Sequence, residues 1–527
     1  MSRDFQLPGR SPVIAGEGMA ATSHPLASLA AIDTLRAGGN AVDAAVTAAA
    51  VLCVVEPQMT GIGGDCFAML SRPGQPVWGY NGCGRAGARA STAELIGQGM
   101  RFIAGNSIHA VTVPGAIEAW AAILAAHGRR SLADALAPAI RYAEHGFPVA
   151  ARIAWDWGRE LDKLSADKGA ARHYLFAGRA PAEGDVVKLP ALAQTLKTVA
   201  AQGPRAFYEG AIADDMVATV AARGSFLTAQ DFAEHRGEVV TPITTNYRGV
   251  DVFELPPNTQ GLTALVLLNI LERFDLGALD PHGPDRAHLA LEAARLAYAV
   301  RDTHVGEPAA MRTAVPDLID KAFAAKLAAR IDRAQRVPLP TSPAPGGDTV
   351  YLTVVDRDRM AVSFINTLFS HFGVGICTER TGIVLTNRGA CFVLEPEHPN
   401  TFGARKRPLH TIIPALAFRD GRCVTSFGVM GSHYQPMGHV HVLTNMVDFG
   451  MDVQQAIDAP RAFFVDEQTV IERGFPAATA AGLEARGHDV VGAPTPWGGG
   501  QAISIDWQRG VLIGGSDPRK DGCAIGY

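Results

Sequence analysis

The feature that most constrains this chain is a proline- and glycine-rich segment, residues 336–348 (RVPLPTSPAPGGD), that runs directly into two strand-like segments. Its four prolines exclude a continuing helix, and its glycine pair frees the backbone. Residues 349–355 (TVYLTVV) and 360–366 (MAVSFIN) are rich in β-formers and flank a charged turn, which predicts a β-hairpin. Thr349 therefore stands where an irregular segment becomes a strand.

This junction has two interpretations that the pattern alone leaves open. The simpler one is an interdomain linker that leads into an ordinary hairpin. In the other, the Thr349 hydroxyl attacks the carbonyl of Asp348, the acyl group shifts to oxygen, and water releases a new N-terminus. The freed α-amine, with a pKa of about 7.7–8.0, is then a suitable base for the neighbouring hydroxyl.

Helix-like and strand-like segments are mixed along the rest of the chain. A strand is predicted at residues 66–70, after the glycine-rich residues 61–64. Residues 41–55 are mostly apolar but contain Asp43 and are too short to span a bilayer, so they predict a buried helix. The helices expected from periodicity are residues 24–35, 41–55, 117–126, 131–145, 190–201, 209–223, 262–274 and 285–301.

Composition argues against several classes of partner and site. A formal net charge of -5 gives no reason to expect nucleic acid or a membrane as partner. The seven cysteines are widely spaced with no CxxC pair, which argues against a zinc site or a disulfide framework and fits a reducing compartment. No apolar leader opens the sequence, so we expect a soluble, cytoplasmic protein.

Several segments occur in an order and spacing that are specific when taken together. They are AATSHPLASLAAIDTLRAGGNAVDAAVTAAAVLCVVEPQMTGIGGDCFAML, VTVPGAIEAW, TPITTNYRGVDVFELPPNTQG, LAYAVRDTHVGEP and DTVYLTVVDRD. Through them the chain resembles the γ-glutamyltranspeptidase family nearly end to end. The resemblance implies an N-terminal-nucleophile hydrolase with an α+β fold, a four-layer αββα sandwich. It also implies a precursor that cleaves itself into a large subunit, residues 1–348, and a small subunit, residues 349–527, which stay associated; a higher homo-oligomer is left open.

The resemblance also assigns roles around the nucleophile, Thr349. Asn366 falls on a family asparagine of the catalytic centre, and the backbone amides of Gly431 and Ser432 fall on the oxyanion hole, which needs no particular side chain. The threonine that hydrogen-bonds the nucleophile in typical members falls near Phe364, whose ring cannot do so.

Ser363 or Thr353 is expected to compensate for that phenylalanine. Both carry a hydroxyl that can donate or accept a hydrogen bond. The resemblance does not choose between them.

The substrate-binding positions depart from the family pattern. The family's arginine for a substrate α-carboxylate falls near Cys83. Its aspartate for the α-amine falls on Cys391, whose thiol cannot pair with an ammonium as a carboxylate does. The pocket has thus lost an anionic group and gained cationic or neutral donors, which suits a substrate with a carboxylate but no α-ammonium. The residues expected to contact that substrate are Arg85, Arg388, His410, Thr411 and His433.

Together these expectations describe hydrolysis of a small-molecule amide through a threonine acyl-enzyme, with no metal and no organic cofactor. A small, carboxylate-bearing, oxamate-like amide is favoured as substrate. γ-Glutamyl hydrolysis or transfer on glutathione-like amides is the main alternative, and acylase action on larger amides is less favoured.

Three other classes are disfavoured. A conventional serine hydrolase would use Ser432-His433 or Ser370-His371, but adjacent residues do not usually face each other, and neither pair lies in a GxSxG elbow. Nucleotide binding by residues 61–64 lacks the required strand-to-helix context, so a tight turn is favoured there. The intact Asp348-Thr349 junction argues against a non-processing relative of the family.

Overall fold

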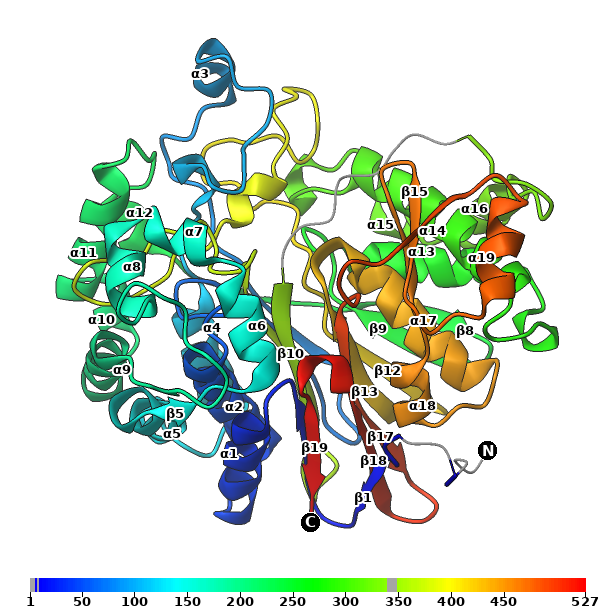
Figure 1. The fold of residues 1–527 in the computed structure, drawn as a ribbon, viewed down its shortest axis with the longest axis horizontal. Helices are drawn as coiled ribbons and strands as arrows, with labels where there is room; N and C mark the ends of the chain where they lie inside the picture. The colour runs from blue at the N-terminus through cyan, green and yellow to red at the C-terminus, as the bar shows by residue number, and fades with distance from the viewer. Residues whose placement is uncertain (1–4, 7–8, 339–347) are drawn as a thin grey trace.

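Two seven-stranded antiparallel sheets face each other at the centre of the molecule (Figure 1). The computed structural model describes residues 5–6, 9–338 and 348–527, with the backbone alone at Asp348. The first sheet is ordered β19 (Cys523–Gly526), β2 (Met19–Thr22), β10 (Asp348–Val355), β11 (Ala361–Phe369), β3 (Asp65–Ser71), β4 (Trp78–Gly82) and β7 (Glu238–Val240). The second is ordered β1 (Val13–Ala15), β18 (Val511–Ser516), β17 (Gly499–Asp506), β13 (Arg422–Met430), β12 (Ala415–Arg419), β9 (Val250–Glu254) and β8 (Ile243–Tyr247).

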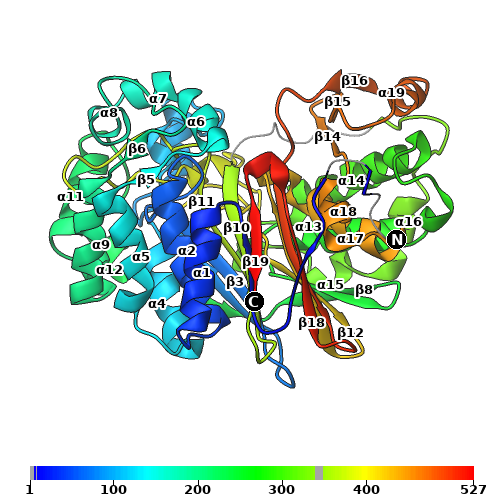
Figure 2. The same ribbon diagram turned by 60° about the horizontal axis from the view of Figure 1, so that its bottom comes forward.

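Helices cover the outer face of each sheet (Figure 2). The first sheet is covered by α1 (Pro25–Arg36), α2 (Ala41–Val55), α4 (Ala116–His127) and α5 (Leu132–His145). The second is covered by α13 (Gly261–Leu271), α14 (Pro284–His304), α17 (Gln435–Val447) and α18 (Val453–Asp458). A separate set of buried apolar side chains fills each of the three interlayer spaces. This arrangement is the expected α+β, four-layer αββα sandwich.

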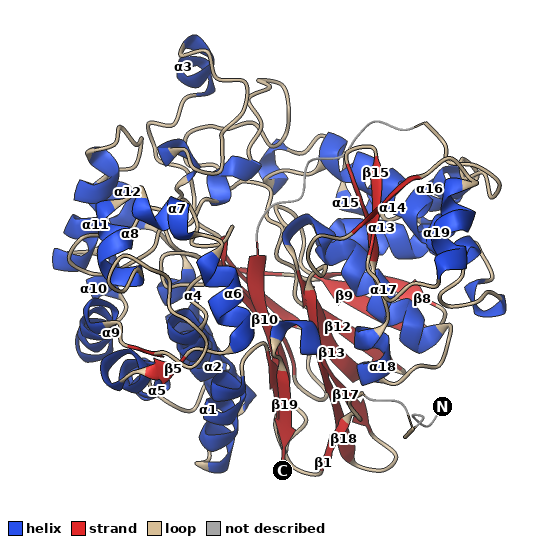
Figure 3. Ribbon diagram, viewed as in Figure 1, coloured by secondary structure: helices blue, strands red, loops and turns tan. Residues whose placement is uncertain are grey.

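Shorter elements lie around these four layers (Figure 3). Two small sheets pair β14 (Ala462–Val465), β15 (Gln468–Ile471) and β16 (Asp489–Gly492), and β5 (Phe147–Pro148) with β6 (Val186–Val187). The remaining helices are α3 (Thr92–Gly97), α6 (Ala151–Gly158), α7 (Leu161–Ser165), α8 (Lys168–Tyr174), α9 (Pro190–Gln202), α10 (Arg205–Tyr208), α11 (Ala211–Ala221), α12 (Ala229–Glu234), α15 (Val315–Leu318), α16 (Lys321–Ala328) and α19 (Ala477–Glu484).

The expected helices are all present, and α2 is the buried helix that its apolar run predicted. All of its residues are buried, and Asn40 with Asp43 forms a capping box at its N-terminus. The buried Asp43 carboxylate also accepts the backbone amides of Arg129 (2.9 Å) and Arg130 (3.0 Å), which satisfies its charge. No helix in the described part of the chain is long and apolar enough to cross a membrane.

The predicted hairpin is β10–β11, at the centre of the first sheet, and the predicted strand is β3 beside it. The glycines before β3 form a tight turn, as expected. A Cβ on Gly63 would lie 2.0 Å from the carbonyl oxygen of Val384, and one on Gly64 would lie 1.9 Å from that of Thr367. Only glycine permits this approach, which brings the turn against the end of β11.

Candidate active site

Thr349 lies at the start of β10, fully buried, with its hydroxyl oxygen 3.0 Å from that of Thr367 on β11. The pairing of the two strands shifts register between Asp348 and Val350, so Thr349 occupies an irregularity at the end of the ladder. Thr367 Oγ1 also accepts the amide of Phe369 (2.8 Å), which fixes its position. Thr367 can therefore orient the Thr349 oxygen.

This partner differs from the expected ones. Ser363 Oγ lies 2.7 Å from a tyrosine hydroxyl, and Thr353 Oγ1 donates to a serine 2.7 Å away, both deeper between the two sheets. Phe364 packs toward the helices. The prediction that Ser363 or Thr353 compensates is therefore wrong. Strand alternation places Thr367 on the face of Thr349, so counting along the second strand could have found it.

Asn366 lies on the opposite face of β11 from Thr367. Its Nδ2 donates to Thr60 Oγ1 (2.8 Å), and its Oδ1 accepts from Trp120 Nε1 (3.3 Å). Because successive side chains of a strand point to opposite faces, the side chain is directed away from the Thr349 hydroxyl. The structure thus corrects its placement among the catalytic residues: Asn366 ties β11 to the loop after α2.

β13 of the second sheet runs toward Thr349 across the interior. Thr353 of β10 donates to Ser426 of β13, and one step along, the ring of Tyr351 fills the space that a side chain on Gly428 would need. From the first pair to the second, the residue number falls by two on β10 and rises by two on β13. The next pair in this series is Thr349 with Met430, the last residue of β13.

The Gly431-Ser432 pair directly follows that end. Gly431 has φ +118° and ψ 36°, and a Cβ there would lie 2.8 Å from the Cα of Gly498, so glycine is required. Ser432, with φ +54°, begins a short 3-10 helix, whose first amides have no partner within the helix. The pair therefore lies just beyond the end of β13, and the Ser432 amide has no partner within the short helix that it begins.

Arg388 is a buried cation beside these elements. Its side chain is 0% exposed, and its guanidinium lies 4.1 Å over the ring of Phe369, the last residue of β11. Nη1 donates to Thr411 Oγ1 (2.8 Å), and Nε lies 4.0 Å from Asp65 Oδ2. Nε and Nη2 have no hydrogen-bond partner among the described residues. Buried guanidinium donors left unmade are costly, so Arg388 is suited to an anionic ligand.

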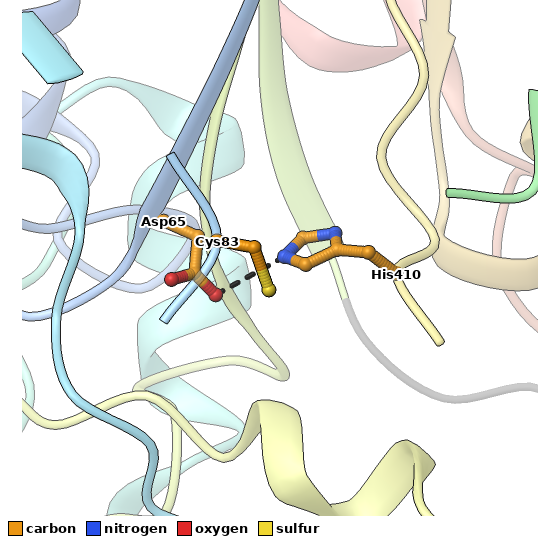
Figure 4. A group of neighbouring side chains, drawn as sticks. All are labelled: Asp65, Cys83 and His410. Atoms are coloured by element: carbon orange, nitrogen blue, oxygen red, sulfur yellow. Dashed lines mark hydrogen bonds and ion pairs between the residues drawn. The ribbon is translucent and has the colours of Figure 1, made fainter. Parts of the chain in front are cut away.

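Asp65 supplies a buried carboxylate that sequence reasoning missed. It is the first residue of β3 and pairs in register with Thr367, beside the nucleophile's partner. Its Oδ2 lies 3.1 Å from His410 Nε2 (Figure 4). Its Oδ1 accepts the Gly84 amide (2.8 Å). The expectation that the pocket had lost its anionic group is therefore wrong, because this carboxylate comes from the glycine-rich turn instead.

Burial controls the protonation of this cluster. It raises the pKa of Asp65 to about 6, although the Arg388 charge opposes the rise. Burial, and then Arg388, lowers the pKa of His410 well below its usual value. Because His410 Nδ1 accepts the amide of Ile412 (3.3 Å), Nε2 carries the proton and donates to Asp65.

Asp65, Cys83 and His410 offer oxygen, sulfur and nitrogen atoms within 4.8 Å of one another, a set that a metal ion could share (Figure 4). Two features oppose a cation there. Burial raises the pKa of the Cys83 thiol, and the Arg388 guanidinium already faces Asp65. We therefore assign a hydrogen-bonded charge cluster rather than a metal centre.

Thr411 and His433 belong to the same buried cluster. Thr411 accepts from Arg388, and His433 Nδ1 lies 3.1 Å from Arg301 Nη1, with its ring at 88° to that of Phe369. Burial, then the charges of Arg301 and Arg388, lowers the pKa of His433 well below its usual value, so the imidazole is neutral.

Arg85 lies outside the cluster. Its side chain is 35% exposed and pairs with Glu307, and its Nη1 also donates to the carbonyl of Arg405 (2.9 Å). β4 ends before it, at Gly82, so strand alternation no longer directs its side chain inward. The structure does not bring Arg85 to the expected substrate pocket.

The serine and histidine neighbours have other partners. Ser370 Oγ accepts from Asn387 Nδ2 (3.0 Å), and His371 Nδ1 lies 3.3 Å from Glu160. Ser432 Oγ is buried without a partner in the described part of the chain, so this hydroxyl too is suited to a ligand. Neither arrangement orients a histidine as base for its neighbouring serine.

Comparison with known proteins agrees with this architecture. A family model described as gamma-glutamyltranspeptidase matches residues 27–527. The chain is 38% identical over 524 residues to the glutathione hydrolase-like YwrD proenzyme of Bacillus subtilis (strain 168), covering 98% of this chain and 99% of that protein. It is 36% identical over 530 residues to the oxamate amidohydrolase proenzyme of Klebsiella pneumoniae, covering 98% and 99%.

A solved structure extends the match to three dimensions. Cephalosporin acylase from Bacillus halodurans superposes with a TM-score of 0.93 at 38% identity, covering 100% of this chain and 99% of that one. The chain therefore belongs to the γ-glutamyltranspeptidase family of N-terminal-nucleophile hydrolases, enzymes that act on amide bonds.

Proposed function

We propose that the chain is a self-processing amide hydrolase that cuts itself between Asp348 and Thr349. Thr349 Oγ1 adds to the Asp348 carbonyl carbon, the peptide nitrogen leaves as an amine, and it takes up the hydroxyl proton. Water then hydrolyses the ester. The products are a large subunit, residues 1–348, and a small subunit, residues 349–527, that begins with the Thr349 amine. The proenzyme names of both relatives support this processing.

In turnover, the α-amine of Thr349 is the base. It takes the Oγ1 proton as the oxygen adds to the substrate carbonyl, while Thr367 orients that oxygen. The amides of Gly431 and Ser432 donate to the oxyanion. The C–N bond then breaks, the amine product leaves with the proton, and water hydrolyses the ester. No step needs a metal or an organic cofactor.

The observation that carries the substrate proposal is the buried Arg388 with unused Nε and Nη2 groups. Thr411 and the ring of Phe369 hold its guanidinium, which leaves a rigid fork of donors for a carboxylate. Both oxygens of Asp65 already accept hydrogen bonds, so this carboxylate is occupied rather than open to a substrate ammonium. We assign a small amide with an adjacent carboxylate, of the oxamate type, and the oxamate amidohydrolase relative supports it.

The second candidate is γ-glutamyl hydrolysis or transfer, favoured by the glutathione hydrolase-like relative. A γ-glutamyl group would use Arg388 for its carboxylate but would need Asp65 to turn toward its ammonium. Acylase action on larger amides, suggested by the cephalosporin acylase, ranks third. All seven cysteines are free thiols, which supports a reducing, cytoplasmic setting.

Two measurements test these proposals. Denaturing electrophoresis of purified protein should give two fragments, and the smaller should begin Thr349-Val350-Tyr351; a single chain that stays intact on incubation contradicts self-processing. Mature protein should turn over oxamate with a higher kcat/KM than a γ-glutamyl anilide. Faster turnover of the anilide would transfer the assignment to γ-glutamyl chemistry.

A further inference from the structure

The proposed chemistry uses Arg388 and gives its neighbour Asp65 no task. Both side chains are 0% exposed, and the Asp65 carboxylate lies 4.0 Å from the Arg388 Nε. The two charges balance each other in a part of the molecule that excludes bulk water. Removing one of them, or adding a third, therefore changes the free energy of the other.

The titratable and charged groups that act on Asp65 come from several elements. They are Arg388 and Cys391 on the 3-10 helix Arg388–Cys391, Arg407 and His410 before β12, Cys66 beside Asp65 on β3, Cys83 after β4, and Tyr208 on α10. A guanidinium cation has no site for a further proton, so neither arginine can take one up. His410 would have to break its Ile412 bond to gain a proton, because its Nε2 is already protonated.

In the mature enzyme the α-amine of Thr349 also lies near Asp65, because the Thr349 hydroxyl bonds Thr367, which pairs in register with Asp65. That amine titrates near neutral pH, so the Asp65→Asn variant below is needed to separate its proton from that of Asp65.

A substrate carboxylate on Arg388 would place a second anion against the same guanidinium. Two buried carboxylates that share one cation do not both stay ionised without a large cost, and the usual result is a raised pKa for one of them. A ligand carboxylate with a low pKa stays ionised, so the pKa that rises is that of Asp65. Asp65 can accept a proton and still accept hydrogen bonds from Gly84 and His410, because a neutral carboxyl keeps acceptor sites.

We propose that Asp65 takes up one proton when Arg388 binds a substrate carboxylate, so that the pocket binds its acyl group as a carboxylate plus a proton. This inference rests on the proposed function, in which Arg388 holds that carboxylate. The proton comes from solvent and adds to an Asp65 oxygen, and no bond of the substrate changes. One proton balances one added charge, so the pocket selects acyl groups with a single negative charge over dianions.

The raised pKa of Asp65, about 6 in the ligand-free pocket, agrees with this role. At neutral pH the carboxylate is mostly ionised before the ligand arrives, so a proton has to be taken up on binding. If a ligand raises the pKa of Asp65 further, its affinity falls as the pH rises from the Asp65 pKa of the free enzyme to that of the complex.

Calorimetric titration of the mature enzyme with pyruvate tests the inference. Pyruvate has one carboxylate, no amide, and stays ionised throughout the range. At about pH 7.5, the binding enthalpies in buffers of different ionisation enthalpy should reveal uptake of about one proton. Affinity should weaken by about tenfold per pH unit between the free and bound pKa values of Asp65.

Two variants test whether Asp65 is the group that takes up the proton. Asp65→Asn should bind pyruvate with no proton uptake and little pH dependence, while Asp358→Asn, at an exposed aspartate, should behave like the unmodified enzyme. If Asp65→Asn does not fold, the titration of the unmodified enzyme still decides whether a proton is taken up. Pyruvate binding without proton uptake, or uptake that persists in Asp65→Asn, overturns the inference and leaves Arg388 as the carboxylate site. Failure to bind pyruvate, or binding unchanged in Arg388→Gln, overturns the proposed carboxylate site itself.

Discussion

The hairpin that carries the nucleophile and the loops that form the acyl pocket position their residues in different ways. Successive side chains of β11 point to opposite faces of the sheet, so Thr367 contacts Thr349 while its neighbour Asn366 faces the helices. The pocket side chains come from segments without such a period. Arg388 lies in a short 3-10 helix and His410 in the stretch before β12, and hydrogen bonds and a stacked ring hold them.

The residues that perform the reaction and the residues that select the substrate therefore depend on different kinds of contact. The two hydroxyls of the hairpin need only their own strand pair, whereas the Asp65–His410 contact joins residues 345 positions apart. A pocket built from long-range contacts can change its charge without disturbing the strands. One family can therefore keep a threonine nucleophile and exchange the group that recognises the acyl chain.

The largest expected effect tests the hairpin side of this comparison. Thr349→Ala removes the attacking oxygen, so the chain should remain uncleaved and amide turnover should fall by at least about 10³-fold. Denaturing electrophoresis and a turnover assay measure both effects. Thr349→Ser keeps a hydroxyl and should still yield two fragments. Cleavage at the same bond in Thr349→Ala would show that another residue performs the attack.

The next effect tests the pocket side. Arg388→Gln removes the charge that holds the substrate carboxylate, so kcat/KM for oxamate should fall by about 10²–10³-fold, the usual cost of a lost buried charge pair. Self-cleavage should continue, because the Asp348-Thr349 bond does not use this cation. Arg129→Gln, at an arginine that is 57% exposed, is the matched control. An unchanged kcat/KM in Arg388→Gln would show that Arg388 does not bind the substrate carboxylate.

Most of the fold could be predicted from the sequence because its signals are local. A run of β-formers after a proline-rich segment marks β10, and the buried apolar run of α2 marks the helix that covers it. Strand alternation also predicts Thr367 as the partner of Thr349, because the two side chains point to the same face of the sheet. The family resemblance had instead placed this partner near Phe364, on the opposite face.

The pocket could be predicted only in part. Arg388, Thr411 and His433 do gather, but Asp65 depends on a partner brought in by tertiary folding. Arg85 was misplaced for the same reason: its counter-charge, Glu307, lies far along the chain, and nothing near Arg85 in sequence announces that pairing.

A smaller effect concerns the two hydroxyls of the hairpin. Thr367→Val keeps the shape of the side chain but removes the hydrogen bond to Thr349, so turnover and the rate of self-cleavage should each fall by about tenfold to hundredfold. Thr353→Val is the control, because that threonine bonds Ser426 deeper in the sandwich. Single-turnover kinetics separate the two steps. Equal slowing by both variants would mean that Thr367 acts only through packing.

The smallest catalytic effect is expected on the other face of the same strand. Asn366→Ala leaves the Thr60 hydroxyl and the Trp120 N–H without their partner, which should lower the free energy of unfolding by about 2–3 kcal/mol. Urea titration in the Thr349→Ala background measures this on one uncleaved chain. In mature enzyme that has folded, kcat should change by no more than about twofold, because the hydroxyl pair lies across the sheet. A large loss of kcat with unchanged stability would instead place Asn366 in the chemistry and show that strand alternation alone does not separate support from catalysis here.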